Sequence, residues 1–495
     1  MKLAMVLAGV ELVQSRADEA LEVTRLEWDS RRVRHGDLFF GLPGVTRDGR
    51  EFAAPAVAQG AAAAVVEYDP EAPPLTVTPR VEVRDAREAM ARAAGNLNGQ
   101  PSHALRIAAV TGTNGKTTTT WLVESIARAA GMRPGVIGTT GYRLGDEVRS
   151  APFTTPEAPD LQRLLREMLD RGIEAVAIEV SSHALHQRRS FGLECDVAVF
   201  TNLSHDHLDY HGTLERYLDA KLMLFDGRNR ADRIKNTVAV VNLDDAAGAS
   251  VVAAARHGGL AVVTYGSRNG VSLKIGSLAA DPGGISFEIE SVEGRRRIRL
   301  PLLGRYNAWN ATAALGAARA LGISDEHSVA GLAQAPAVPG RLEPVRVGQP
   351  FDVVVDYAHT PDALERSLAA AREHATGRVL LVFGCGGDRD RAKRPRMGAI
   401  AAERADVAWV TSDNPRSEDP ARIVAEVRAG DRAGKLRVEI DRRAAIGAAI
   451  GGARPGDMVV IAGKGHETTQ TIGEQVLPFD DREVARSLMG AGSST

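Results

Sequence analysis

Residues 108–131 read AAVTGTNGKTTTTWLVESIARAAG, and this stretch decides the fold of the chain. It predicts a buried strand, a glycine-containing turn and a helix that opens at Lys116. The amides of such a turn and the helix N-terminus converge on an anion, while Lys116 adds a positive charge and Thr117 a hydroxyl for Mg²⁺. The predicted site for a nucleoside triphosphate comprises Gly112, Thr113, Asn114, Gly115, Lys116, Thr117 and Thr118.

Short apolar runs alternate with helical stretches along most of the chain. Examples are RIAAVTG (106–112), EAVAIEV (174–180), DVAVF (196–200), TVAVVNL (237–243), DVVVDYA (352–358), RVLLVFG (378–384), DVAWVTS (406–412) and DMVVIAG (457–463). Continuous apolar runs that lead into polar turns are typical of strands buried on both faces of a parallel sheet. We therefore predict an α/β protein with more than one doubly wound sheet, and an antiparallel excursion where residues alternate within 265–303.

The length of 495 residues suggests about three domains. Polar, proline-containing segments precede the strands at 106 and 352, which places boundaries near 103 and 337. The predicted domains are therefore 1–103, 104–337 and 338–495.

Charge and cysteine content exclude several classes of protein. Lys plus Arg number 61 against 63 Asp plus Glu, a balance that argues against a nucleic-acid partner. Cys195 and Cys385 are too few for a disulfide framework, which favours a reducing compartment. The opening MKLAMVLAGV resembles a weak signal-peptide core, but Glu11 interrupts it, and no run approaches the ~20 apolar residues of a membrane span. We expect a cytoplasmic protein, monomeric and without membrane insertion.

Two further segments suggest a metal site. Glu179 lies close to the carboxyl end of the run EAVAIEV, and TNLSHDHLDYHGT (201–213) follows the run DVAVF, so both lie where open α/β sheets bind ligands. A carboxylate from one loop and an imidazole from the other would suit a hard cation beside the phosphates. The alternative is a hydrophilic loop with solvated histidines.

The helix predicted over 213–225 carries an unusual lysine. Leu214, Leu218, Lys221 and Phe225 share one face of it, so the Lys221 amine lies among apolar neighbours. Such a lysine either extends its amine to water or becomes neutral through desolvation and able to add CO₂. The residue pattern by itself favours extension to water.

These motifs resemble those of the Mur ligase family, and in particular its diaminopimelate-adding members. The resemblance extends over essentially the whole chain and includes WDSRRVRHGDLFFGLPGVTRDGREF (28–52), TTPEAPD (154–160), EVSSHALHQRR (179–189), GRYNAWNATAAL (304–315), GCGGDRDRAKRP (384–395), SDNPRSEDP (412–420) and AGKGHET (462–468). It implies a small N-terminal domain for the UDP end of the substrate, a central ATPase domain and a C-terminal Rossmann-like domain.

The resemblance also implies roles for individual residues. The lysine matching Lys221 is carbamylated in the family, which reverses the expectation from the residue pattern, and Thr117, Glu179 and His207 join it around Mg²⁺. The implied catalytic residues are Lys116, Glu179, His207 and Lys221. The implied nucleotide contacts beyond the phosphate turn are Asn307, Asn310, Arg341 and Asp356. The implied contacts to the uridine part of the substrate are Ser30, Val45, Thr46 and Arg47. The implied contacts to the muramoyl dipeptide are Thr154, Thr155, Ser181, Gln187 and Arg189. Phe153 replaces a residue that is often polar in the family.

The implied reaction is ATP-dependent amide-bond formation through an acyl phosphate, in the synthesis of peptidoglycan precursors. It adds meso-diaminopimelate to the D-glutamate of UDP-N-acetylmuramoyl-L-alanyl-D-glutamate. Contacts to the incoming amino acid are implied for Arg389, Asp413, Asn414, Pro415, Arg416, Gly463 and Glu467. A guanidinium at Arg416 suits the distal carboxylate of diaminopimelate, which lysine and ornithine lack.

Three alternatives remain at this point. The first is the same ligase acting on lysine or ornithine. The second is an enzyme similar to folylpolyglutamate synthetase, which should lack the N-terminal domain and the DNPR segment (413–416). The third is a non-catalytic descendant, which could lose Lys116, Lys221 or His207 without penalty; all three are present.

Overall fold

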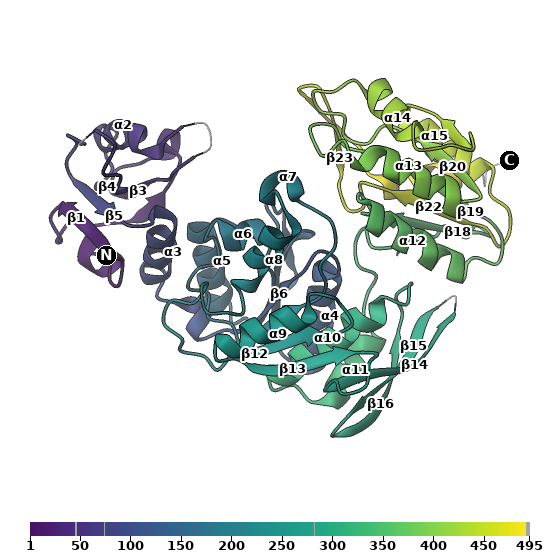
Figure 1. The fold of residues 1–495 in the computed structure, drawn as a ribbon, viewed down its shortest axis with the longest axis horizontal. Helices are drawn as coiled ribbons and strands as arrows, with labels where there is room; N and C mark the ends of the chain where they lie inside the picture. The colour runs from purple at the N-terminus through teal and green to yellow at the C-terminus, as the bar shows by residue number, and fades with distance from the viewer. Residues whose placement is uncertain (45–46, 74, 282, 492–495) are drawn as a thin grey trace.

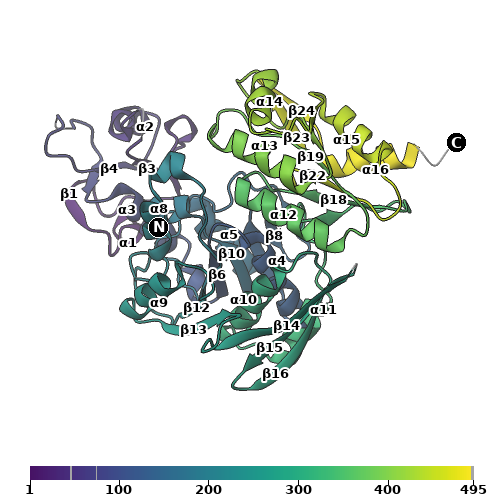
Figure 2. The ribbon, with the colours of Figure 1, turned by 45° about the vertical axis from the view of Figure 1, so that its right-hand side comes forward.

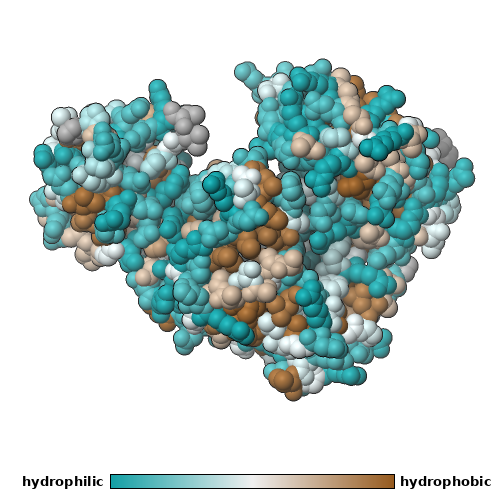
Figure 3. Space-filling model, in the orientation of Figure 1, coloured by the Kyte–Doolittle hydropathy of each residue, from teal (hydrophilic) through white to brown (hydrophobic). Residues whose placement is uncertain are grey.

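The computed structural model describes residues 1–44, 47–73, 75–281 and 283–491. They form three α/β units, each built on its own main sheet (Figure 1). The N-terminal and C-terminal units stand on opposite sides of the central one, with an open notch between them (Figures 1 and 3). The proposed boundaries near 103 and 337 fall between the sheets. None of the helices in the described ranges is long and apolar enough to span a membrane.

The N-terminal sheet has the strand order β1-β5-β4-β3-β2. Strand β1 is antiparallel to β5, and the other neighbours are parallel. Its elements are α1 (Leu3–Val6), β1 (Leu12–Arg16), β2 (Arg25–Glu27), η1 (Ser30–Arg32), β3 (Asp37–Gly41), η2 (Gly49–Phe52), α2 (Ala53–Ala58), β4 (Ala63–Glu67), β5 (Arg80–Val83), α3 (Ala86–Leu97) and η3 (Pro101–His103).

The central sheet has the order β16-β15-β14-β13-β12-β11-β6-β10-β7-β8-β9. Strands β7, β10, β6, β11, β12 and β13 run parallel in its middle, and antiparallel strands extend both edges. Its strands are β6 (Arg106–Thr111), β7 (Pro134–Gly138), β8 (Gly141–Leu144), β9 (Glu147–Arg149), β10 (Ala175–Glu179), β11 (Val197–Phe200), β12 (Val238–Asn242), β13 (Ala261–Gly266), β14 (Leu273–Asp281), β15 (Gly284–Ser291) and β16 (Gly294–Leu300).

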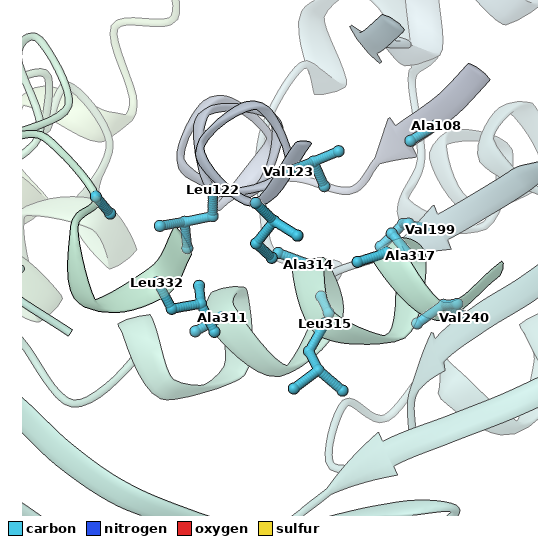
Figure 4. Close-up of a cluster of buried hydrophobic side chains, with 14 of the residues drawn as sticks. Ala108, Leu122, Val123, Val199, Val240, Ala311, Ala314, Leu315, Ala317 and Leu332 are labelled. Atoms are coloured by element: carbon cyan, nitrogen blue, oxygen red, sulfur yellow. The ribbon is translucent and has the colours of Figure 1, made fainter. Parts of the chain in front are cut away.

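Helices cover both faces of this sheet. They are α4 (Lys116–Ala129), α5 (Ala158–Asp170), α6 (Ser182–His186), α7 (Leu208–His211), α8 (Leu214–Leu222), α9 (Gly248–His257), α10 (Asn307–Ala320) and α11 (Asp325–Ala333). On β6, Ala108 and Val110 pack with α4, α10 and α11, as Figure 4 shows for Ala108, while Ile107 and Ala109 pack with α5 and α9. Successive side chains of a strand point to opposite faces of the sheet. Because both faces of β6 are buried, its successive residues must be apolar, which explains the apolar run within RIAAV.

The C-terminal sheet has the order β17-β18-β22-β19-β20-β21, parallel except for β17. Its elements, with a separate hairpin of β23 and β24, are β17 (Glu343–Pro344), β18 (Asp352–Asp356), α12 (Pro361–His374), β19 (Val379–Phe383), α13 (Lys393–Arg404), β20 (Val407–Val410), α14 (Pro420–Arg428), β21 (Leu436–Val438), α15 (Arg442–Gly451), β22 (Met458–Ala462), β23 (Thr469–Ile472), β24 (Gln475–Pro478) and α16 (Asp481–Ala491). Helix α12 lies on the side that faces the central unit (Figures 1 and 2).

The predicted fold class is confirmed. Each quoted apolar run contains a strand with parallel neighbours, and the excursion within 265–303 is the antiparallel extension β14-β15-β16. Strand β6 lies between β10 and β11: the chain passes from β6 to β7 on one side, and later from β10 across to β11 on the other. The carboxyl ends of these three strands therefore meet at a switch point, where open α/β sheets bind ligands.

Candidate functional site

The predicted phosphate turn lies directly after β6 and ends where α4 begins at Lys116. Gly112 and Gly115 adopt φ values of 144° and 86°. A Cβ at Gly112 would lie 1.9 Å from Thr201 Oγ1, and one at Gly115 would lie 2.3 Å from Asn310 Oδ1. Both positions therefore require glycine, because of their backbone conformation and because of the neighbouring side chains.

Two lysine amines converge on this turn. Lys116 Nζ donates to the carbonyl oxygens of Gly112 at 2.9 Å and Thr113 at 2.8 Å. Lys221 Nζ donates to the same Gly112 oxygen at 2.9 Å, so the two amines lie within about 6 Å of each other. The phosphate turn and Lys221 thus form one centre, although they are separated by about a hundred residues in sequence.

Lys221 does not extend its amine to water, which corrects the expectation from the residue pattern alone. Only 1% of the residue is exposed, and its amine lies 4.3 Å from the centre of the Tyr217 ring. The helix also differs: α8 ends at Leu222, and Leu214 is 40% exposed. Burial, reinforced by the charge of Lys116, lowers the pKa of Lys221 well below its usual value and favours the neutral amine.

Glu179, at the end of β10, connects the phosphate turn with the predicted substrate residues. Its carboxylate accepts hydrogen bonds from the Thr117 hydroxyl at 3.1 Å and from the backbone amide of Thr139 at 2.8 Å. The Thr139 hydroxyl also donates to it and lies 3.0 Å from the Thr154 hydroxyl. Thr155 donates to the Glu179 carbonyl and accepts from the Ser181 amide. The sequence did not single out Thr139.

His207 lies beside this centre in the loop that follows β11. Its backbone has φ 53°, and its Nε2 is 3.5 Å from the Asp206 carboxylate. Desolvation within the cavity and the charges of Lys116 and Lys221 lower the pKa of His207 to about 4, although Asp206 opposes this shift. The imidazole is therefore neutral at physiological pH, as a metal ligand must be.

A cavity of about 380 Å³ opens on the other side of the phosphate turn. Its lining includes Asn114, Asn310, Arg341 and Asp356, with Tyr265 and Trp309 as aromatic walls. Asn307 supports Asn310 through a hydrogen bond of 2.8 Å but is not part of the lining. Arg341 reaches back from the segment before β17 to the Thr117 hydroxyl, 3.2 Å away. This cavity suits a nucleoside attached to phosphates at the turn.

A second cavity, of about 600 Å³, lies between the central and C-terminal units. Predicted substrate residues from both units line it: Thr154, Thr155, Ser181, Arg189, Arg389, Asp413, Asn414, Arg416, Gly463 and Glu467. His207 lines it as well, and so do Asp206, His359 and Lys393, which the sequence did not single out. Most of the predicted dipeptide and amino-acid contacts therefore face one space, whereas Gln187 and Pro415 are not part of its lining.

Arg189 is held from several sides. Its Nη2 donates to Gln187 Oε1 at 2.6 Å, and its Nε lies 2.9 Å from the Glu157 carboxylate. The guanidinium also lies 5.0 Å from the centre of the Phe153 ring. Phe153 thus acts as a cation–π partner of Arg189.

The DNPR segment is fixed by contacts from neighbouring loops. Asn414 donates to the Glu467 carboxylate at 2.7 Å and accepts from the Thr471 amide of the β23-β24 hairpin at 2.9 Å. Arg416, with φ 51°, donates to the Gly387 carbonyl at 2.7 Å. Burial and the nearby Asp413 raise the pKa of Glu467, while Lys464 opposes the shift.

Of the predicted uridine contacts, Ser30 and Arg47 lie in the N-terminal unit and belong to neither cavity lining. Ser30 begins η1, and the Arg47 guanidinium lies 5.6 Å from the centre of the Phe52 ring. Val45 and Thr46 lie outside the described residues.

The phosphate turn makes contacts with residues that the sequence gave no reason to select. Across the units, Asn114 donates to Asp362 at the start of α12, 2.9 Å away; within the central unit, Asn202 accepts from the Asn114 amide at 3.0 Å. The strand-end argument used for Glu179 could have indicated Asn202, because it follows β11. No local signal could have paired Asn114 with a residue 248 positions away.

The sequence matches known family models, and the structure resembles solved structures. Residues 22–97 match the family model described as Mur ligase family, catalytic domain; residues 110–318 match the Mur ligase middle domain; and residues 340–465 match the Mur ligase, glutamate ligase domain.

A curated relative from Geobacillus kaustophilus, named UDP-N-acetylmuramoyl-L-alanyl-D-glutamate–2,6-diaminopimelate ligase, is 49% identical over 94% of each chain. One of the same name from Solibacter usitatus is 45% identical over 99% of this chain and 98% of its own. A solved structure of that name is 35% identical, with a TM-score of 0.71 and complete coverage of both chains.

A folylpolyglutamate synthase from Mycobacterium tuberculosis, complexed with ADP and AMPPCP, covers 76% of this chain and 92% of its own, with a TM-score of 0.62. At 20% identity it shows a shared fold alone. The three matched models and the relatives of full length lead to one assignment: the chain belongs to the Mur ligase family.

Proposed function

We propose that the protein is an ATP-dependent ligase that joins meso-diaminopimelate to the D-glutamate carboxylate of UDP-N-acetylmuramoyl-L-alanyl-D-glutamate. The observation that carries this proposal is the convergence of the Lys116 and Lys221 amines on one carbonyl of the phosphate turn, beside a cavity shared with the DNPR segment. The names of the full-length relatives support the choice of substrates. We also propose that it acts as a monomer in the cytoplasm; residues of a single chain line both cavities, which supports the first of these points.

The chemistry requires two anions to meet. A carboxylate must attack the γ-phosphate of ATP to form an acyl phosphate, and both groups are negatively charged. Lys116, Arg341 and the N-terminus of α4 bring positive charge to the phosphate turn. Arg189 and the Thr154 hydroxyl lie where they would hold the dipeptide carboxylate toward this centre.

The donor set fits Mg²⁺. Glu179 contributes a carboxylate, Thr117 a hydroxyl and His207 a neutral imidazole. Within the described residues, no three His, Cys, Asp or Glu side chains gather into a metal site, so further oxygen donors are needed. Bound Mg²⁺ would offset phosphate charge and polarise the γ-phosphate.

A carbamate on Lys221 would supply such oxygens. The buried, uncharged amine can add CO₂ to form N–COO⁻ with release of one proton, which converts a lysine into an anionic ligand. The lowered pKa and the absence of a salt bridge to Lys221 within the described residues support this modification.

The C-terminal unit provides the binding site for the incoming amino acid, whose amine accepts the acyl group. Asp413 and Glu467 are suited to an ammonium group, and Arg416 to the distal carboxylate of a diamino dicarboxylic acid. The amine nitrogen attacks the acyl phosphate, phosphate leaves, and an amide remains. Because the two halves of the cavity come from different units, their approach would exclude water from the reactive acyl phosphate.

An assay of ADP formation tests the proposal. Purified protein receives ATP, Mg²⁺ and the UDP-muramoyl dipeptide together with diaminopimelate, lysine or ornithine in separate reactions, and the products are identified by mass spectrometry. We expect ADP and a tripeptide product with diaminopimelate, and at least ~10-fold lower kcat/KM with the other two. Equal or better turnover of lysine or ornithine would contradict the substrate assignment.

A further inference from the structure

Arg442 and Asp481 form a buried ion pair beneath the predicted amino-acid site. Arg442 Nε donates to Asp481 Oδ1 at 2.8 Å, and Nη2 donates to Oδ2 at 2.7 Å. Both side chains are 0% exposed, and they begin helices α15 and α16. Charges buried in this way gain little stability over apolar residues of the same volume, so stability alone does not explain the pair.

The remaining donors of Arg442 reach two strand ends. Nη2 also donates to the Ala462 carbonyl at 3.0 Å, and Nη1 to the Ser412 carbonyl at 3.4 Å. Ala462 directly precedes Gly463, and Ser412 directly precedes Asp413. Strands β20 and β22 are not neighbours, because β19 lies between them. One guanidinium therefore links the two loops that carry the predicted contacts to the amino acid.

The charge of Arg442 also acts on these loops. Burial lowers the pKa of Arg442, but Asp481 and, more weakly, Asp413 and Glu467 outweigh this effect and raise it overall. The attraction is mutual, so Arg442 favours the ionised form of Glu467, which burial opposes. Besides Arg442, the charged or titratable groups that act on Glu467 are Asp413, Lys464 and Tyr357.

We propose that Arg442, oriented by Asp481, is a positioning residue for the incoming diamino acid. It fixes the loops that begin at Asp413 and Gly463 relative to each other, so that the Asp413 and Glu467 carboxylates face the same ammonium group. This inference rests on the proposed function, because it assumes that the cavity beside DNPR binds a diamino acid.

The test compares Arg442→Gln, Asp481→Asn and Arg442→Lys with the unmodified protein in the ADP assay, at pH 6 and pH 8. For Arg442→Gln and Asp481→Asn we expect KM for diaminopimelate to rise about 10-fold, the loss typical of side chains that orient direct ligands, with KM for ATP nearly unchanged. For Arg442→Gln the increase should be larger at pH 6, because Glu467 protonates more readily without the guanidinium. Arg442→Lys should restore the pH dependence but only part of the affinity, because an amine lacks the planar fork.

The matched control is the ion pair between Arg378 and Asp457 in the same sheet. Their side chains are 2.6 Å apart, and they directly precede β19 and β22, at the edge opposite the amino-acid site. Arg378→Gln should leave KM for diaminopimelate unchanged even where it lowers the melting temperature.

Unchanged KM in the Arg442 and Asp481 variants would overturn the inference, and so would an equal rise in Arg378→Gln, which would indicate general loosening of the domain. If Arg442→Gln does not fold, Asp481→Asn and Arg442→Lys decide on the same measurements. Failure of the unmodified protein to use diaminopimelate would instead refute the proposed function.

Discussion

The phosphate turn and the amino-acid site use positive charge in opposite ways. At the turn, Lys116 donates to backbone carbonyls and Arg341 to the Thr117 hydroxyl, and within the described residues neither forms a salt bridge, while the buried Lys221 amine is uncharged. At the amino-acid site, Lys464 pairs with Glu467, and Arg442 pairs with Asp481. A region that receives a polyanion leaves its cations unneutralised, whereas one that receives a zwitterion balances its charges in advance.

The largest effect should follow from loss of the charge at the turn. Lys116→Ala should lower ATP-dependent phosphate release by about 10³-fold, because the transition-state charge loses a nearby donor. Lys274→Ala, in the antiparallel extension where Lys274 faces Glu290, is the control and should retain full activity. Undiminished release in Lys116→Ala would exclude this turn from catalysis.

Replacing Lys221, the second amine at the turn, should lower turnover less than replacing Lys116, and part of the loss should be recoverable. Lys221→Ala should lower turnover about 100-fold, with partial recovery when a short carboxylic acid is added to replace the carbamate. Lys235 is a suitable control, because its amine pairs with Asp196 close to the amino ends of the central strands. Wild-type turnover in Lys221→Ala would contradict the carbamate role.

The sequence predicted the turn better than it predicted the surroundings of Lys221. Strand, glycine turn and helix are consecutive, so the position of Lys116 follows from local geometry. The burial of Lys221 depends on Tyr217 and on the Gly112 carbonyl, which the fold brings to it from a distant strand. Helical spacing alone placed it beside Leu214, which is exposed.

At the amino-acid site, too, the sequence predicted one part and not the other. The DNPR segment identified the loop, but the buried pair of Arg442 and Asp481 and the Asn414–Glu467 bond join residues 39 and 53 positions apart. Each lies in an ordinary polar segment near a helix end or a turn. Their contacts depend on how three loops of one sheet pack, and composition carries no signal for that.

At the balanced site, removal of one cation should change binding rather than turnover. Arg416→Ala should raise KM for diaminopimelate about 30-fold, equivalent to about 2 kcal/mol for a charge-assisted hydrogen bond, and leave KM for ATP nearly unchanged. Arg437→Ala is the control, since that guanidinium lies over Trp409 and outside the cavity lining. An unchanged KM in Arg416→Ala would show that Arg416 does not read the distal carboxylate.

A smaller effect is expected at Glu157, which lies beside Arg189. Burial raises the pKa of Glu157 above its usual value, although Arg189 and Arg87 oppose the shift. As the pH falls through this raised pKa, the carboxylate is protonated and Arg189 loses its partner, so KM for the dipeptide should rise in mild acid. Glu157→Gln should raise KM about threefold and remove this pH dependence. If Glu157→Gln keeps the pH profile of the unmodified protein, Glu157 does not help to position the substrate.

The most direct test of a single reaction centre is a crystal structure of the protein with Mg²⁺, a non-hydrolysable ATP analogue and the UDP-muramoyl dipeptide. The account predicts the γ-phosphate between the side chains of Lys116 and Lys221, with carbamate density on Lys221 and the D-glutamate carboxylate facing the phosphate. A γ-phosphate bound away from Lys221, with an unmodified amine and the dipeptide carboxylate directed elsewhere, would contradict it.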